Sequence, residues 1–92
     1  MARLSPSEVE AGLAGLGGWR RVGDAIVRDL ELAGFTAAIG LVNRVAELAE
    51  DAGHHPDILV HAYRRVRLTL TTHSAGGITA ADLALARRID SL

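Results

Sequence analysis

The chain has 92 residues, of which 49% are hydrophobic and 3% aromatic, with ten arginines, no lysine, no cysteine and a formal net charge of −1. This length predicts a single domain over residues 1–92 with an aliphatic core, small enough that oligomerisation is expected. The nearly balanced charge argues against nucleic-acid binding. The absence of cysteine excludes disulfides and thiolate metal sites. The chain also lacks a membrane-spanning apolar run and a secretion signal, which predicts a soluble cytoplasmic protein that is not in a membrane.

The segment from Ser5 carries the signals of a helix start. Ser5 is a capping residue, Pro6 fits the first helical position, and Glu8 completes a capping box. The apolar residues that follow on one face are Val9, Leu13 and Leu16, and Gly17 and Gly18 are expected to end the helix.

Residues 19–35 predict a β-hairpin with its turn at Gly23-Asp24. The second strand alternates, with Ile26, Arg28, Leu30 and Leu32 on one side and Val27, Asp29 and Glu31 on the other. Because Arg28 falls on the apolar side, we expect it near an edge or paired with a carboxylate.

Between residues 35 and 52 the period becomes helical. The predicted apolar stripe consists of Phe35, Ala38, Ile39, Val42, Val45, Ala46 and Ala49. Gly53 fits a left-handed C-cap, and Pro56 prevents the helix from continuing.

Residues 58–72 read as one strand region, with Val66, Leu68 and Leu70 facing one way and Arg65, Arg67, Thr69 and Thr71 facing the other. The arginines are expected to form a solvated sheet face. A last helix begins with Thr79 as its cap, Asp82 in the capping box, and Leu85, Ala86 and Ile89 facing inward. The order α-β-β-α-β-α predicts an α+β two-layer sandwich with helices on one face of a mainly antiparallel sheet.

Three histidines stand out around the predicted strand region. His54 and His55 directly follow the helix cap, and His73 lies just past the other end of the strand region. A straight strand would keep the two ends apart, so bringing them together requires a bend or bulge near residues 58–62. The fourth histidine, His61, is expected to be an ordinary polar loop residue.

General acid–base catalysis is the chemistry that these histidines favour, because imidazole exchanges protons near neutral pH. A metal site is disfavoured, since adjacent histidines rarely converge on one ion. Ser74 beside His73 has no glycine elbow or orienting acid for nucleophilic catalysis. Structural alternatives stay open for Asp82 as a helix cap and for Trp19 as a core residue. A dehydration, which moves protons without a nucleophile or metal, suits such a cluster.

The motif "EDAGHHP" from Glu50, followed by Tyr63, "TH" at Thr72-His73 and Asp82, resembles the pattern of the pterin-4a-carbinolamine dehydratase family. The spacings from Glu50 to His54, from Tyr63 to His73 and from His73 to Asp82 match. The resemblance extends over nearly the whole chain from Trp19. It implies a four-stranded antiparallel sheet with helices on one side, a pterin as substrate, and homodimers or homotetramers.

The resemblance also implies the reaction, which is loss of water from a 4a-hydroxytetrahydropterin without metal or organic cofactor. His54 and His73 would donate protons to the departing hydroxyl, and His55 would bind substrate and take the ring-nitrogen proton; the division between His54 and His55 stays open. The residues implied in substrate binding are Gly53, Pro56, Asp57, Thr72, Ser74, Ala75 and Trp19, with Glu50, Tyr63 and Asp82 in support.

Several positions depart from the family pattern. Asp57-Ile58 replaces Glu-Trp, Tyr63 comes one residue later, and Leu30 and Leu32 stand where phenylalanine is common. The inserted residue fits the bend that the strand region requires. The resemblance leaves two alternatives to the dehydratase: a non-catalytic module of the transcription-cofactor or Rubisco-chaperone type, and a pterin-related role near molybdopterin. The three preserved histidines favour the enzyme.

Overall fold

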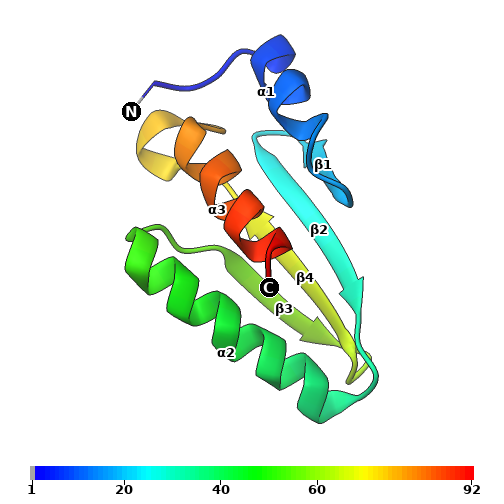
Figure 1. Cartoon of the computed structure of the whole chain (residues 1–92). Helices are drawn as coiled ribbons and strands as arrows, with labels where there is room; N and C mark the ends of the chain where they lie inside the picture. Colours follow the sequence, from blue (N-terminus) through cyan, green and yellow to red (C-terminus); the bar gives the residue numbers. More distant parts are fainter. Residues whose placement is uncertain (1) are drawn as a thin grey trace.

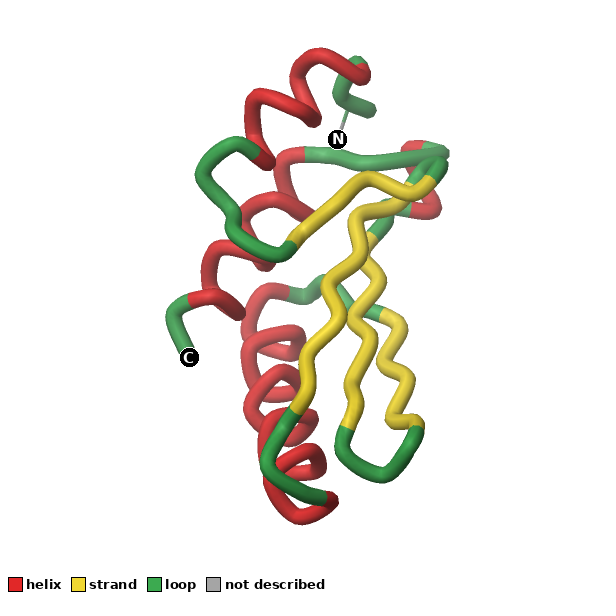
Figure 2. The backbone as a smooth tube through the Cα atoms, turned by 90° about the vertical axis from the view of Figure 1, so that its right-hand side faces the viewer, coloured by secondary structure: helices red, strands yellow, loops and turns green. Residues whose placement is uncertain are grey.

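The computed structural model describes residues 2–92. The chain forms two layers, a four-stranded antiparallel sheet and three helices that cover one of its faces (Figures 1 and 2). In chain order the elements are α1 (Pro6–Leu13), β1 (Trp19–Val22), β2 (Ala25–Glu31), α2 (Phe35–Ala52), β3 (Asp57–His61), β4 (Arg65–Leu70), the 3-10 turn η1 (His73–Ala75) and α3 (Ala80–Asp90). The predicted α+β two-layer class is confirmed.

Helices α1 and α3 both begin with the predicted capping boxes. In α1 the Glu8 backbone N–H donates to Ser5 Oγ at 3.2 Å, and the Ser5 N–H donates to Glu8 Oε1 at 2.8 Å. In α3 the same arrangement joins Thr79 and Asp82. The first box is exposed and the second is fully buried, so only the second can serve a site inside the molecule.

The β1–β2 hairpin turns at Gly23-Asp24 as predicted, with Gly23 in the left-handed region at φ 59°. Strand β2 pairs with β4 at the centre of the sheet, which leaves β1 and β3 as the edges. Arg28 points to the helix side and forms an ion pair with Asp90 at the end of α3. A carboxylate partner thus explains the arginine in the apolar pattern, as expected.

The strand region predicted over residues 58–72 is a β-hairpin. Strand β3 ends at His61 and β4 starts at Arg65, with the chain reversing through Ala62 and Tyr63 at φ 46° and 50°. The sequence did not predict this reversal, because such turns favour glycine, asparagine or aspartate and this turn contains none of them. The full reversal, rather than a bend in one strand, returns the chain to His73.

The buried face of α2 differs from the predicted stripe. Its buried residues are Ala38, Leu41, Val45 and Ala49. Phe35 is 56% exposed and Ala46 is also exposed, whereas Ile39 and Val42 are half-buried. The apolar arc of the helix is wider than the surface that the sheet covers, so periodicity alone could not show which part faces inward.

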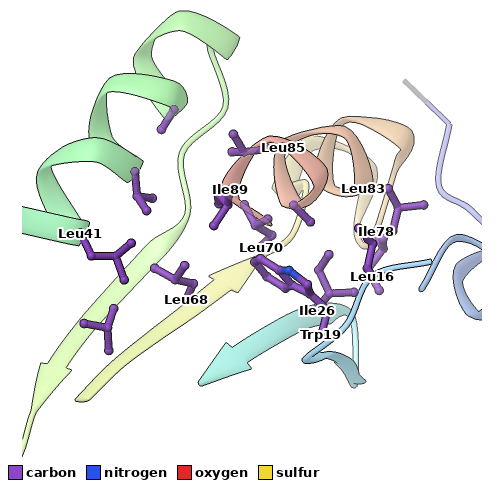
Figure 3. Close-up of a cluster of buried hydrophobic side chains, with 14 of the residues drawn as sticks. Leu16, Trp19, Ile26, Leu41, Leu68, Leu70, Ile78, Leu83, Leu85 and Ile89 are labelled. Carbon is purple, nitrogen blue, oxygen red and sulfur yellow. The ribbon is translucent and has the colours of Figure 1, made fainter. Parts of the chain in front are cut away.

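The core lies between the sheet and the helices (Figure 3). Leu85 and Ile89 of α3 belong to the same buried cluster as Leu68 and Leu70 of β4, and Trp19 lies beside Ile26. The outer face of the sheet carries ion pairs such as Arg67–Asp29 at 2.7 Å. The arginines of β4 therefore lie on a solvated face, as predicted.

Candidate active site

Two loops at the same end of the molecule form a cleft of about 290 Å³. One loop follows the C-terminal end of α2 and the other follows the C-terminal end of β4. Both loops lie next to the start of α3 (Figure 1). The cleft is lined by Gly53, His54, His55, Thr71, Thr72, His73 and Ser74. Two larger hollows, of about 400 and 510 Å³, lie elsewhere and have no histidine in their walls. The three predicted catalytic histidines therefore share one cleft.

The left-handed cap at Gly53 places His54 at the mouth of the loop. Gly53 adopts φ 63°, and the His54 N–H donates to the carbonyl of Ala49, which ends α2 without a further turn. The His54 side chain is 17% exposed, and its Nε2 lies 2.5 Å from Asp82 Oδ1. The helix end and the carboxylate together fix the orientation of this imidazole.

Asp82 has no exposed surface and accepts several hydrogen bonds. Its Oδ2 accepts from the Thr79 backbone N–H and from the Thr72 hydroxyl, both at 2.8 Å. The Thr72 and Thr79 hydroxyl oxygens lie 2.9 Å apart. Asp82 therefore caps α3, which is the structural alternative that the sequence offered, and the same carboxylate contacts a histidine of the cleft.

His55 has a different environment. Its Nε2 lies 2.7 Å from Glu50 Oε2, and both side chains are more than half exposed. This carboxylate reaches back from the last turn of α2, five residues earlier in the chain. The pair can hold the ring at the rim of the cleft, but water screens it far more than it screens His54 and Asp82.

His73 starts the η1 turn on the opposite side of the cleft. Its backbone is held by a closed loop in which Thr72 and Gly77 exchange hydrogen bonds of 2.9 and 3.3 Å. Its side chain is exposed, and no hydrogen bond to it is found within residues 2–92. The ring can therefore meet a ligand without first leaving a protein partner.

The other residues implied by the resemblance are placed less uniformly. Gly53, Thr72 and Ser74 line the cleft, whereas Pro56, Asp57 and Ala75 flank it without lining it. Tyr63 lies just past the far end of β3, and the strand separates it from the cleft by about 16 Å.

Trp19 is buried in the core, where its Nε1 donates to Asp90 at 2.8 Å. That contact lies near the end of α3, about 12 Å along the helix from Asp82. Two residues were missed by sequence reasoning. Thr71 lines the cleft, and Thr79 joins the buried network; the cap motif signalled Thr79 only as a helix start.

Comparisons with known proteins agree on the family. The family model described as pterin 4 alpha carbinolamine dehydratase matches residues 2–92. The chain belongs to this family. A relative from Thermomicrobium roseum is 53% identical over 92 residues, which cover 100% of this chain and 98% of the relative. One from Nocardia farcinica is 53% identical over 89 residues, covering 97% and 93%. The names of both assign them provisionally to the pterin-4-alpha-carbinolamine dehydratases.

Two solved structures share the fold. A transcriptional coactivator/pterin dehydratase from Brucella melitensis has a TM-score of 0.90 and 38% identity, with coverage of 97% of this chain and 96% of that chain. A pterin dehydratase-like RuBisCO assembly factor of the alpha-carboxysome has a TM-score of 0.66 and 25% identity, covering 80% and 87%. The fold therefore occurs in proteins named for catalysis and in one named for assembly.

Residues 2–92 contain neither a cluster of metal ligands nor a helix suited to spanning a membrane. No group of three or more histidine, cysteine, aspartate or glutamate side chains is arranged to hold a metal ion in this part of the chain. No helix within the same residues combines the length and apolar character that crossing a bilayer requires.

Proposed function

We propose that this protein dehydrates a 4a-hydroxytetrahydropterin to the quinonoid dihydropterin by histidine acid–base catalysis, as a step in tetrahydropterin recycling. The observation that carries the proposal is the convergence of His54, His55 and His73 on one cleft, with His54 held by the buried Asp82. Family membership supports the pterin substrate class.

The reaction needs one acid and one base. The C4a–O bond breaks as the hydroxyl takes a proton and leaves as water, and the neighbouring ring nitrogen loses its proton as the carbon–nitrogen double bond forms. Atoms and charge balance without an oxidant or a metal. Histidine suits both roles near neutral pH, and each positioned proton transfer contributes about 10²–10⁴-fold.

The two sides of the cleft suggest how the roles divide. His54 and His73 lie on opposite loops, and we assign them as the proton donors to the departing hydroxyl. His55 with Glu50 lies at the rim and is assigned to substrate binding and to accepting the ring-nitrogen proton. The backbone of Gly53 and of residues 72–74 supplies the polar groups against which a flat pterin ring can lie.

A non-catalytic binding module is the second candidate, because the carboxysomal assembly factor shares this fold. The contact between His54 and Asp82 argues for catalysis, since a surface that only binds protein has no need of a buried carboxylate aimed at an imidazole. The dehydration assay separates the two candidates.

We also propose that the chain assembles into homodimers or homotetramers. Strand β3 is an open sheet edge, and its middle residue, Leu59, is 52% exposed. Antiparallel pairing of two copies about Leu59 would place Asp57 of each copy opposite His61 of the other, a favourable pair when the histidine is charged. The same pairing would bring the turn containing Tyr63 towards His55 of the second copy. Analytical ultracentrifugation of wild type and Leu59→Lys tests this, with a lighter species expected for the variant.

The deciding experiment follows the absorbance of freshly generated 4a-hydroxytetrahydropterin, with the spontaneous reaction as the baseline. Wild type should accelerate dehydration, and His54→Ala and His73→Ala should each lower the rate by about 10²-fold or more. His61→Ala is the control for losing an imidazole outside the cleft. Because His61 also lies on the proposed β3 interface, the sedimentation of this variant is measured beside its dehydration rate. A wild-type rate equal to the baseline would refute the enzyme and favour the binding module.

A further inference from the structure

The hydrogen bonds around Asp82 allow one direction of proton donation when its carboxyl group is ionised. The Ala81 backbone N–H donates to Thr79 Oγ1 at 3.2 Å, and the Thr72 hydroxyl donates to Asp82 Oδ2 at 2.8 Å. A hydroxyl carries a single proton. Because Thr72 has given its proton to the carboxylate, the 2.9 Å contact between the two hydroxyls must be a donation from Thr79 to Thr72.

The same ionised carboxylate determines which nitrogen of His54 carries a proton. An ionised carboxylate only accepts hydrogen bonds, so the nitrogen that faces Asp82 Oδ1, Nε2, must be the donor. In the neutral ring the other nitrogen, Nδ1, then holds the lone pair and is the one left for a ligand. Proton donation from this ring to the departing hydroxyl therefore requires the imidazolium form, in which Nδ1 also carries a proton. His54 lines the cleft, so this tautomer sets the proton chemistry that the ring presents there.

We propose that Thr72 is a positioning residue. With Thr79 behind it, its hydroxyl holds Asp82 so that the carboxylate keeps His54 in the Nε2–H tautomer. Thr72 directly precedes His73, so the same residue connects the buried network to the loop that carries the opposite histidine. The hydroxyl is thereby assigned to the protein network and not to the substrate. The catalytic meaning of this role rests on the proposed function, but the tautomer does not.

The neighbouring residue supplies a matched control. Thr71 also lines the cleft, but its hydroxyl donates to the backbone carbonyl of Asp24 at 2.6 Å and has no contact with Asp82. Thr72→Val and Thr71→Val make the same nearly isosteric change one residue apart. Thr72→Ser keeps the hydroxyl and should restore the wild-type behaviour.

The test is a long-range ¹H–¹⁵N correlation spectrum of the histidine rings, recorded where the imidazoles are neutral. Wild type, Thr72→Ser and Thr71→Val should show His54 as the Nε2–H tautomer. Thr72→Val should shift its ring nitrogens towards a mixture of tautomers. An Nδ1–H tautomer in wild type overturns the proposal even if the valine variant fails to fold, and so does an unchanged His54 signal in a folded Thr72→Val.

Kinetics provide the second readout. Thr72→Val should lower kcat for dehydration by about 10–100-fold, because it removes a group that orients a functional residue. KM should change less than about twofold. A raised KM with unchanged kcat would show that Thr72 contacts the substrate directly and would overturn the assignment. If wild type does not dehydrate the carbinolamine at all, the proposed function fails, while the spectra still decide the role of Thr72.

Discussion

Asp82 and Asp90 occupy opposite ends of α3, and the same side chain has a different environment at each. Asp82 is fully buried in the first turn, where the helix dipole favours a negative charge. Asp90 lies in the last turn, where the dipole opposes one, and it is neutralised by Arg28 and receives the Trp19 N–H. The dipole, together with the hydrogen bonds from Thr72 and the Thr79 N–H, stabilises Asp82 without an arginine. Its remaining oxygen can therefore contact a histidine, whereas Asp90 is committed to holding β1 and β2 against the helix.

Removing Asp82 should have the largest effect, because it affects both stability and the cleft. Asp82→Ala removes the capping box and leaves the Thr72 and Thr79 donors unpaired, which should lower the free energy of unfolding by about 2–4 kcal/mol. The dehydration rate should fall by about 10–100-fold as His54 loses its partner. Urea unfolding and the dehydration assay measure the two effects. A folded variant of full activity would contradict the role of Asp82.

Removing Asp90 should affect stability alone. Asp90→Ala leaves Arg28 partly buried without its counter-charge, which should lower the free energy of unfolding by about 3 kcal/mol. The dehydration rate of the folded protein should stay within about twofold of wild type, because the residue lies about 12 Å along the helix from Asp82. The double variant Arg28→Met/Asp90→Leu should recover part of the stability, since it removes both charges together but still leaves the Trp19 N–H without its acceptor. A double variant less stable than Asp90→Ala would refute this account.

The exposed capping box of α1 allows the stability contribution of a helix cap to be measured without any effect on the cleft. Ser5→Ala removes the hydroxyl that accepts the Glu8 N–H, and we expect a loss of about 1 kcal/mol in the free energy of unfolding. Dehydration should be unaffected, because this box lies outside the cleft. Urea unfolding of Ser5→Ala beside Asp82→Ala measures how much of the larger effect is capping.

The smallest effect is expected on the solvated face of the sheet. The hydrogen bond from the Arg67 guanidinium holds the pKa of Asp29 below its ordinary value, helped by Arg20. A carboxyl group with a lowered pKa in the folded state stabilises the protein above its unfolded pKa, and the contribution is lost as the pH falls through the folded pKa. Asp29→Asn should therefore lower Tm slightly at pH 7, and the difference should shrink as the pH falls below about 4 and be lost once the pH is below the folded pKa. An equal difference in Tm at pH 7 and pH 3 would contradict this origin.

Much of the fold could be predicted because its signals are local. The cap at Ser5, the turn at Gly23-Asp24 and the left-handed Gly53 all occur where the sequence places them. The reversal at Ala62 and Tyr63 could not be predicted, because neither residue favours positive φ and the sheet imposes it. The buried face of α2 was also ambiguous, since its apolar arc is wider than the surface that covers it.

Residue types and spacings are properties of the chain, so the three histidines, the aspartate spaced to cap α3 and the family could all be recognised without a structure. The folded structure was needed to show that His54 contacts Asp82, that Thr72 binds the same carboxylate, and that Trp19 and Tyr63 lie away from the cleft. These contacts join residues from separate elements. They depend on the β3–β4 reversal and on the packing of α3 against the sheet, neither of which a local pattern contains.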